Sequence, residues 1–99
     1  MNINDMEASV GKASALLRAL ANERRLMILC QLVEGEKSVG SLVEQLGIAQ
    51  AMISQQLSLL KKEGLVVSRR EGQSVFYAVA NPSAVKILQV LYDTYCPQQ

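Results

Sequence analysis

The sequence predicts a mainly α-helical protein with a small β-hairpin, and three observations lead to this prediction. Apolar residues recur at helical spacing through most of the 99 residues. Residues that cap helices stand just before several of these segments. Two short β-rich runs, LVVSRR and SVFYAV, are separated by EGQ, in which Gly72 can adopt the positive φ of a tight turn. The 49% of hydrophobic and 19% of charged residues fit one globular domain covering residues 1–99.

The first half of the chain predicts three helices. The first covers residues 6–20. Asn22 can cap a second helix that ends at Gly35, and the wide apolar side of this helix favours a central position. A short third helix begins after the cap residue Ser38 and is closed by Gly47. The core stripe of the second helix is expected to consist of Leu26, Leu29, Cys30 and Val33.

Only Gly47, Ile48 and Ala49 lie between the third predicted helix and the fourth. A turn of this length that contains glycine is typical of a helix-turn-helix. The hairpin that follows would then be a wing, and a fifth helix comes after it. We therefore expect a winged helix-turn-helix of five helices plus the wing.

The fourth helix lies in the segment AQAMISQQLSLLKKEGLV and has two different faces. At about 100° per residue, its apolar side chains form one core stripe. The opposite face carries small or amide-bearing side chains, which suits contact with another molecule. The core stripe consists of Ile53, Leu57 and Leu60, flanked by Met52 and Leu59. The opposite face consists of Ala51, Ser54, Gln55 and Ser58, with Lys61 and Lys62 following.

Asn81 and Pro82 supply the cap and first position of a last helix that runs to about Tyr95, and Pro97 prevents its continuation. Its apolar residues cover more than one face, which a single core cannot use. We therefore expect a homodimer in which the first and last helices pack across a two-fold axis. These apolar residues are Ala84, Val85, Ile87, Leu88, Val90, Leu91, Tyr92 and Tyr95.

The net charge of +1 gives no reason to expect a nucleic-acid partner, but the distribution of charge does. Residues 61–70 carry four basic groups against Glu63 alone. Such a cluster is usually a solvated surface. Beside a helix-turn-helix in a dimer, however, cations can contact phosphates while amide and hydroxyl side chains contact base edges.

We therefore expect double-stranded operator DNA as the partner, with an imperfect inverted repeat that matches the two-fold dimer. Gln56 lies toward the apolar arc of its helix, so it is expected on the DNA backbone rather than on a base. The candidate DNA-binding residues are Gln50, Ala51, Ser54, Gln55, Gln56, Ser58, Lys61, Lys62, Arg69, Arg70 and Gln73.

Several classes of function are excluded by what the sequence lacks. The chain has no histidine, so Ser-His-Asp and Cys-His catalysis and every zinc site that uses histidine are excluded. It has no glycine-rich phosphate loop and no Cys-x-x-Cys pair. We expect neither catalysis nor a cofactor. No signal peptide and no apolar run of about 20 residues is present, which favours the cytoplasm and no membrane association.

The two cysteines, Cys30 and Cys96, stand far apart in the sequence and form no disulfide framework. Cys30 could be a small buried hydrophobic residue, which is common for free cysteine. Cys96 could be an incidental residue at a frayed helix end. A redox-sensing pair is the alternative, and the residues themselves leave the choice open.

Three segments resemble the ArsR/SmtB family of bacterial winged-helix repressors: LLRALANERRLMILCQL, IAQAMISQQLSLLKKEGLV and SRREGQSVFYAV. The second is the most specific. Gln56 stands where many members have histidine, and Ala49 stands where many have a capping serine. The positions that keep the pattern of the family's recognition helix are Gln50, Ser54, Leu57, Lys61, Gly64, Leu65 and Val66.

The resemblance implies that the chain is a repressor. The cysteine positions then distinguish the metal-sensing subgroup from the persulfide-sensing subgroup. Metal-sensing members carry Cys-x-Cys where this chain has Ser38 and Gly40, so we expect no metal site. Cys30 and Cys96 are similar to the pair of the persulfide-sensing subgroup that includes BigR and SqrR. The resemblance implies that reactive sulfur species link these two cysteines, directly or through extra sulfur atoms, and that operator DNA is then released. The alternatives are a metal-responsive or HlyU-like regulator without redox sensing, or a winged helix that binds proteins.

Overall fold

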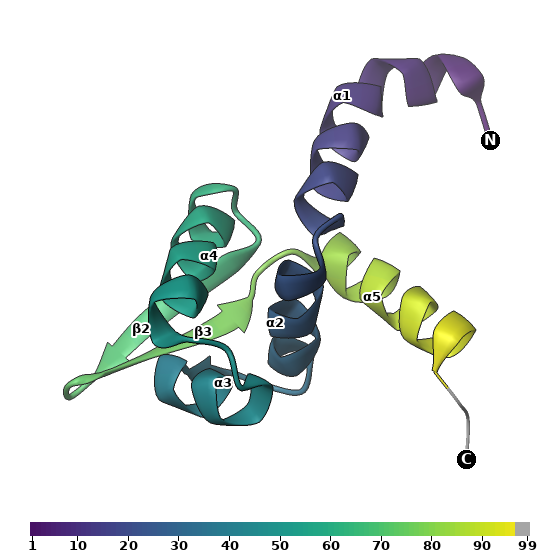
Figure 1. Ribbon diagram of the computed structural model, residues 1–99. Helices are drawn as coiled ribbons and strands as arrows, with labels where there is room; N and C mark the ends of the chain where they lie inside the picture. Colours follow the sequence, from purple (N-terminus) through teal and green to yellow (C-terminus); the bar gives the residue numbers. More distant parts are fainter. Residues whose placement is uncertain (97–99) are drawn as a thin grey trace.

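The computed structural model describes residues 1–96 and contains five helices and three strands (Figure 1). The helices are α1 (Ile3–Leu20), α2 (Glu23–Val33), α3 (Val39–Leu46), α4 (Gln50–Lys62) and α5 (Pro82–Tyr95). The strands are β1 (Lys37–Ser38), β2 (Val66–Glu71) and β3 (Ser74–Val79). The predicted mainly α-helical fold with a hairpin is confirmed. Pro97, which was predicted to stop the last helix, lies outside the described residues.

The predicted helix caps are present. The side chain of Asn22 accepts a hydrogen bond from the Arg25 amide, and that of Ser38 accepts from the Ser41 amide. Asn81 accepts from two amides in the first turn of α5, where Pro82 holds the first position. The predicted start of α1 was wrong by three residues, because Asn2 caps that helix earlier.

The predicted core stripe of α2 is confirmed for Leu29 and in part for Leu26, which is half-buried and packs against the core, and it is wrong for Cys30 and Val33. The buried residues of α2 are Ile28, Leu29 and Leu32, whereas Cys30 and Val33 are exposed. The helix is apolar around so much of its circumference that two stripes were compatible with the sequence. Its predicted central position is confirmed, because α2 contacts α1, α3, α5 and β3.

The hairpin belongs to a three-stranded antiparallel sheet in the order β1-β3-β2. Glu71 pairs with Ser74 at its tip, so only Gly72 and Gln73 form the loop. Gly72 has φ +63° and Gln73 does not have a positive φ, as in a type II′ turn. The sequence analysis missed β1, whose two residues are too few to show alternation. Its pairing with Tyr77 and Phe76 ties the base of the wing to the turn after α2.

One core lies beneath α4 and the sheet. The predicted stripe of α4, Ile53, Leu57 and Leu60, is fully buried. Buried residues of α2 and of the sheet strand β2 belong to the same core. The buried residues are Ala19, Leu20, Ile28, Leu29, Leu32, Leu42, Ile53, Leu57, Leu60, Leu65, Val66, Ala84 and Leu88.

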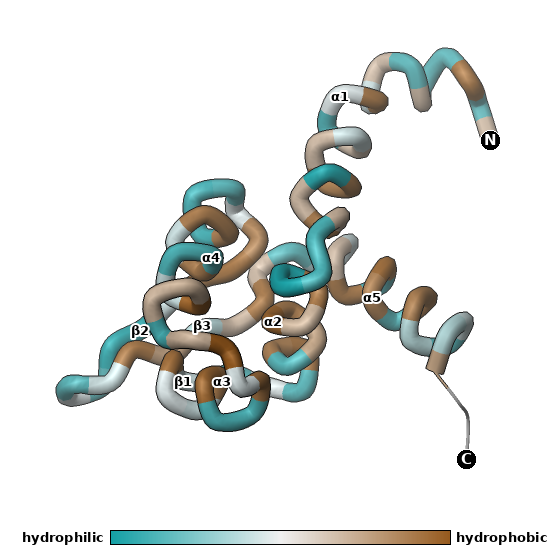
Figure 2. The backbone as a smooth tube through the Cα atoms, viewed as in Figure 1, coloured by the Kyte–Doolittle hydropathy of each residue, from teal (hydrophilic) through white to brown (hydrophobic). Residues whose placement is uncertain are grey.

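Helices α1 and α5 project away from this core on the side opposite the wing (Figure 1). Both contain apolar residues along their length, drawn brown in Figure 2, and several of these are exposed. Val10 and Leu17 of α1 are 55% and 56% exposed, and Val90 and Tyr95 of α5 are 62% and 78% exposed. None of the helices in the described part of the chain combines the length and apolarity needed to cross a bilayer.

Candidate nucleic-acid interface and thiol site

The turn between α3 and α4 has the predicted length, because α3 ends at Leu46 and α4 begins at Gln50. Gly47 takes φ +65°, the left-handed conformation that closes a helix and that glycine adopts without a steric penalty. Ala49 occupies the N-cap of α4 and offers no side-chain hydrogen bond. The first amides of α4 are therefore left without a side-chain partner at the surface.

The polar face of α4 lies at the surface, as the helical projection predicted. Ser54 is half-buried where the helix turns toward the core. No described residue provides a hydrogen bond to the side chains of Gln50, Gln55 or Ser58, so their polar groups are available to an external partner. The exposed members of this face are Gln50, Ala51, Gln55, Ser58, Lys61 and Lys62.

Gln56, which was predicted to contact the DNA backbone, points the other way and has hydrogen-bond partners within the protein. Its Oε1 accepts a hydrogen bond of 2.9 Å from Nε of Arg25, and its Nε2 donates to the sulfur of Met52. The same arginine forms a 3.0 Å ion pair with Glu63 and donates to the carbonyl of Ala19. Gln56 therefore joins α4 to the start of α2.

Of the four cations predicted to contact phosphate, two are bonded to other side chains of the protein and two have no ion-pair partner among residues 1–96. Lys61 donates a 2.7 Å hydrogen bond to Oγ of Ser68 and so joins the end of α4 to β2. Arg69 is paired with two carboxylates. Among residues 1–96, neither Lys62 nor Arg70 has an ion-pair partner. These two cations are available to phosphates.

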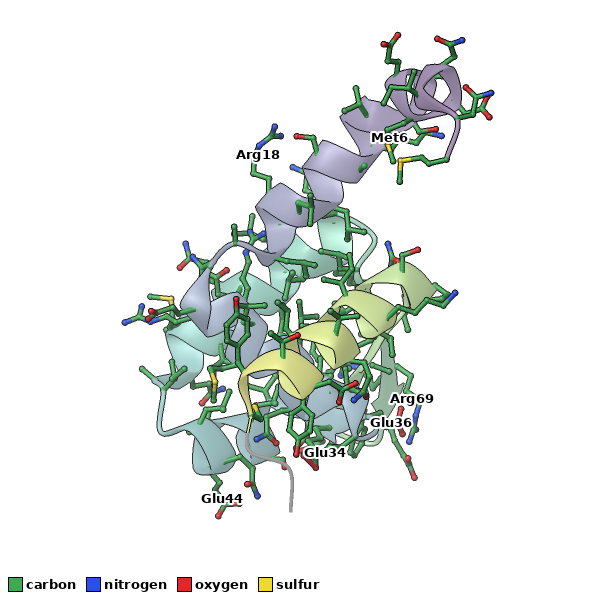
Figure 3. The ribbon with its side chains drawn as sticks, turned by 90° about the vertical axis from the view of Figure 1, so that its right-hand side faces the viewer. Met6, Arg18, Glu34, Glu36, Glu44 and Arg69 are labelled. Atoms are coloured by element: carbon green, nitrogen blue, oxygen red, sulfur yellow. The ribbon has the colours of Figure 1, made fainter. Side chains whose placement is uncertain are left out.

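Arg69 is held on several sides. Its Nε donates to both carboxylate oxygens of Glu36 at 2.9 and 3.0 Å, and its Nη2 bonds the same carboxylate. Its Nη1 donates to Glu71 at 2.7 Å, and the guanidinium lies 4.9 Å from the centre of the Phe76 ring. Figure 3 shows Arg69 and Glu36 beside each other. Arg69, which was predicted to contact phosphate, therefore has its guanidinium nitrogens bonded to carboxylates within the protein.

The electrostatics of this pair agree with its geometry. The hydrogen bond from Arg69 lowers the pKa of the Glu36 carboxyl, and the positive charge of Arg69 lowers it further. The hydrogen bond to Glu36, followed by that to Glu71, raises the pKa of the Arg69 guanidinium. Both groups are therefore charged throughout the physiological range of pH.

Gln73 lies exposed in the two-residue turn at the tip of the wing. The wing extends away from the core on the same side as α4 (Figure 1). The structure thus brings the exposed face of α4 and the wing, with Arg70 and Gln73, onto one side of the molecule.

The second candidate site lies between α2 and α5. Cys30 does not belong to the buried stripe of α2, so the interpretation of this residue as a buried core cysteine was wrong. It borders a cavity of about 360 Å³ whose other walls are mainly apolar. The residues that line it are Met27, Cys30, Gln31, Val33, Glu34, Leu88, Gln89 and Tyr92.

The Cys30 thiol lies in a partly buried environment. Although Cys30 is exposed as a residue, partial burial of its thiol raises its pKa, and the charge of Cys96 raises it further. Tyr92 of α5 lines the same cavity as Cys30, and the amide of Cys96 donates to the Tyr92 carbonyl at 2.9 Å, so Cys96 follows this cavity by one helical turn. Both cysteines are free thiols. The contact between α2 and α5 therefore brings two cysteines that are far apart in the sequence to the same region of the surface.

This environment predicts slow labelling of Cys30 at neutral pH. A raised pKa leaves less thiolate than an unperturbed cysteine has, so the rate of alkylation by iodoacetamide should still be rising well above about pH 8. In Cys96→Ser the second cause is absent, and the pH profile of Cys30 should shift to lower pH. Mass spectrometry of the alkylated peptide measures both profiles, and identical profiles would contradict the proximity of the thiols.

Within residues 1–96, no group of three or more histidine, cysteine or acidic side chains could hold a metal ion. Ser38, at a position where metal-sensing members have cysteine, caps α3 through its hydroxyl. The geometry thus offers an exposed polar surface on α4 and the wing, and two cysteines on the packed helices α2 and α5.

A helix-turn-helix with a hairpin wing defines the class of winged helix-turn-helix regulators, and solved structures of that class match this fold closely. The crystal structure of the repressor BigR from Xylella fastidiosa has a TM-score of 0.92 at 41% identity and covers 99% of this chain and 100% of its own. A winged helix-turn-helix domain from Mycobacterium bovis, described as homodimeric, has a TM-score of 0.75 at 31% identity, covering 96% and 95%.

The chain belongs to the ArsR family of bacterial regulatory proteins, whose family model matches residues 22–68. The transcriptional activator HlyU of Vibrio cholerae is 44% identical over 96 residues, which is 97% of this chain and 89% of that protein. The biofilm growth-associated repressor of Xylella fastidiosa is 40% identical over 99 residues, 100% and 87% of the two chains. The predicted family is confirmed, and the chain is a transcriptional regulator.

Proposed function

We propose that this regulator is a homodimeric repressor that binds operator DNA and releases it when reactive sulfur links Cys30 to Cys96. The observation that carries the DNA-binding part is the exposed polar face of α4 beside the wing. The observation that carries the sensing part is the position of Cys30 at the cavity between α2 and α5, with Cys96 one turn beyond Tyr92, which lines the same cavity.

In the proposed complex, α4 enters the major groove. Gln50, Gln55 and Ser58 can donate to or accept from base edges, with Ser54 and Ala51 beside them. Lys62 and Arg70 contact phosphates, because no described acid neutralises them. Gln73 at the tip of the wing reaches the neighbouring backbone. Gln56 has no part in this surface.

The exposed apolar faces of α1 and α5 support a homodimer. They lie on the side of the molecule opposite the wing, so pairing through them leaves both α4 helices free (Figure 1). The Mycobacterium bovis domain of the same fold is described as homodimeric. A two-fold dimer presents its α4 helices to successive major grooves, about 34 Å apart, and requires an inverted repeat.

The dimer predicts a specific loss of association. Val90→Glu places a charge on the exposed face of α5 and should leave the fold of the monomer intact, because Val90 is 62% exposed. Sedimentation at micromolar concentration should show a dimer for the wild type and a monomer for the variant, with unchanged helical circular dichroism. Gln89→Glu, also exposed on α5, adds the same single charge about 100° away round the helix and serves as the control. A wild-type monomer would contradict the proposal.

The proposed sensing step is thiol exchange with a persulfide, RSSH. The Cys30 thiolate attacks the terminal sulfur, which gives Cys30–SSH and releases the thiolate RS⁻. The Cys96 thiolate then attacks the Cys30 sulfur and expels HS⁻, which leaves a disulfide. If Cys30–SSH first takes a further sulfur from a second RSSH and releases RS⁻, attack of Cys96 on an inner sulfur, again with loss of HS⁻, leaves a polysulfide. The link joins α2, which belongs to the core, to α5, which belongs to the proposed dimer interface.

Linking these helices changes the orientation of one subunit relative to the other, and hence the spacing of the paired α4 helices. The contacting residues stay the same while their fit to successive grooves is lost. One solved structure of HlyU from Vibrio cholerae is described as the reduced protein. A relative whose redox state is distinguished in this way supports a redox role for the cysteines proposed here.

Two alternatives predict different results. A regulator without sulfur sensing would bind the same DNA with reduced or oxidised thiols, and the relatives include an activator as well as repressors. A winged helix that binds only proteins would not be retained on plain duplex DNA. Steeply salt-dependent retention of the wild type on such DNA supports the proposal and excludes the protein-binding module.

A further inference from the structure

The ion pair between Arg69 and Glu36 connects two parts of the chain that are 33 positions apart. Glu36 stands directly before β1, in the turn that follows α2. Arg69 lies on β2, on the outer edge of the sheet, where it pairs in register with Phe76. The pair therefore spans the sheet, from the turn that leads into β1 to the edge strand of the wing.

The donors of Arg69 are already directed at protein acceptors. Each of its three guanidinium nitrogens bonds to a carboxylate of Glu36 or Glu71, and its planar face lies over Phe76. A bidentate arrangement of this kind fixes both the position and the orientation of a guanidinium. Arg70 is the next residue on the strand, so its side chain points to the opposite face of the hairpin.

We propose that Arg69 is a positioning residue that fixes the angle of the wing through Glu36, while the neighbouring Arg70 contacts DNA phosphate. This inference rests on the proposed binding of DNA, but the wing can be tested without DNA. Besides its packing on the core, the hairpin is held by the two-residue strand β1 and by the hydrogen bond from Lys61 to Ser68. The Arg69–Glu36 pair adds a side-chain anchor on the edge strand, at the Phe76 rung where the pairing with β1 ends. Without this pair, the edge strand would move more freely.

Two double variants that preserve the net charge can separate a residue that positions the wing from a residue that contacts DNA phosphate. Glu36→Gln with Arg69→Gln removes the anchoring pair, and Glu34→Gln with Arg70→Gln removes one acid and one base from the same two segments. Glu34 is a suitable control, because its ion pair, at 3.6 Å, is with Lys37 three positions along the chain, and among the described residues it forms none with β2 or β3. Both variants keep the formal charge of +1, so long-range attraction to DNA is matched.

Binding of each variant to plain duplex DNA should be measured from low to moderate salt. The Glu34/Arg70 variant should flatten the slope of log affinity against log salt by about 0.9 for each phosphate that it no longer neutralises. The Glu36/Arg69 variant should keep the wild-type slope and bind about two- to fivefold more weakly at every salt concentration, the range of an exposed ion pair. Equal flattening in both variants would overturn the proposal, because Arg69 would then contact phosphate itself.

Hydrogen exchange in the free protein tests the anchoring of the wing without any DNA. Amides of β2 and β3 should exchange faster in the Glu36/Arg69 variant than in the wild type, whereas those of the Glu34/Arg70 variant should not. Thermal melts establish that both variants are folded. Unchanged exchange in the Glu36/Arg69 variant would refute the anchor even if DNA binding were confirmed. Faster exchange in a protein that bound no DNA would confirm the anchor and refute the proposed function.

Discussion

Treatment of the wild-type protein with a persulfide donor is expected to weaken binding to its operator by about 5- to 150-fold, the range of a coupling of about 1–3 kcal/mol. The physical reason is the link between α2 and α5, which favours an arrangement of the dimer that no longer matches successive grooves. Fluorescence anisotropy with a labelled duplex carrying the inverted repeat measures the change. Dithiothreitol should restore the original affinity, because it reduces the link.

Single substitutions identify the mechanism. Cys30→Ser and Cys96→Ser should each bind the operator with the wild-type affinity before and after treatment, because neither can form the link within one chain. Mass spectrometry of the treated wild type should show a linkage between Cys30 and Cys96 of one subunit. Release of DNA by either single variant, or linkage only between chains, would contradict the mechanism and favour a regulator without this sensing pair.

The elements that were predicted correctly depend on local interactions. The stripe of Ile53, Leu57 and Leu60 has one helical period and no competing apolar face, so its burial followed from the sequence. The caps at Asn22 and Ser38 act within three residues, and their hydrogen bonds are present. The turn before α4 likewise has the predicted length.

The predictions that failed depend on contacts between distant parts of the chain. Helix α2 is apolar on most sides, and only packing against α3, α5 and β3 decides that Leu32 is buried and Cys30 exposed. The hydrogen bond between Gln56 and Arg25 joins residues 31 positions apart, so the sequence pattern around Gln56 did not show this partner. Glu36 stands 33 positions before Arg69, so the charge pattern around Arg69 did not show this ion pair either. Candidate phosphate contacts therefore cannot be separated from structural ion pairs by charge pattern alone.

The two adjacent glutamines of α4 should respond to the same substitution in opposite ways. Gln55 is exposed on the proposed DNA face, so Gln55→Ala should reduce discrimination between operator and unrelated DNA by about 5- to 150-fold for each half-site, the range of about 1–3 kcal/mol for a good bidentate base contact. Its thermal stability should stay close to that of the wild type, because an exposed side chain without an internal partner is removed.

Gln56→Ala provides the matched control, since it removes the same group one position further along the helix. It should lower the free energy of unfolding by about 1–3 kcal/mol, because the hydrogen bond to the guanidinium of Arg25 is lost in a partly buried setting. Discrimination between operator and unrelated DNA should remain near the wild-type value. Competition binding with specific and unrelated duplexes, together with urea unfolding, measures both quantities for both variants. If Gln56→Ala impaired discrimination while Gln55→Ala did not, α4 would meet DNA through a different face, and the orientation proposed for the helix in the groove would be wrong.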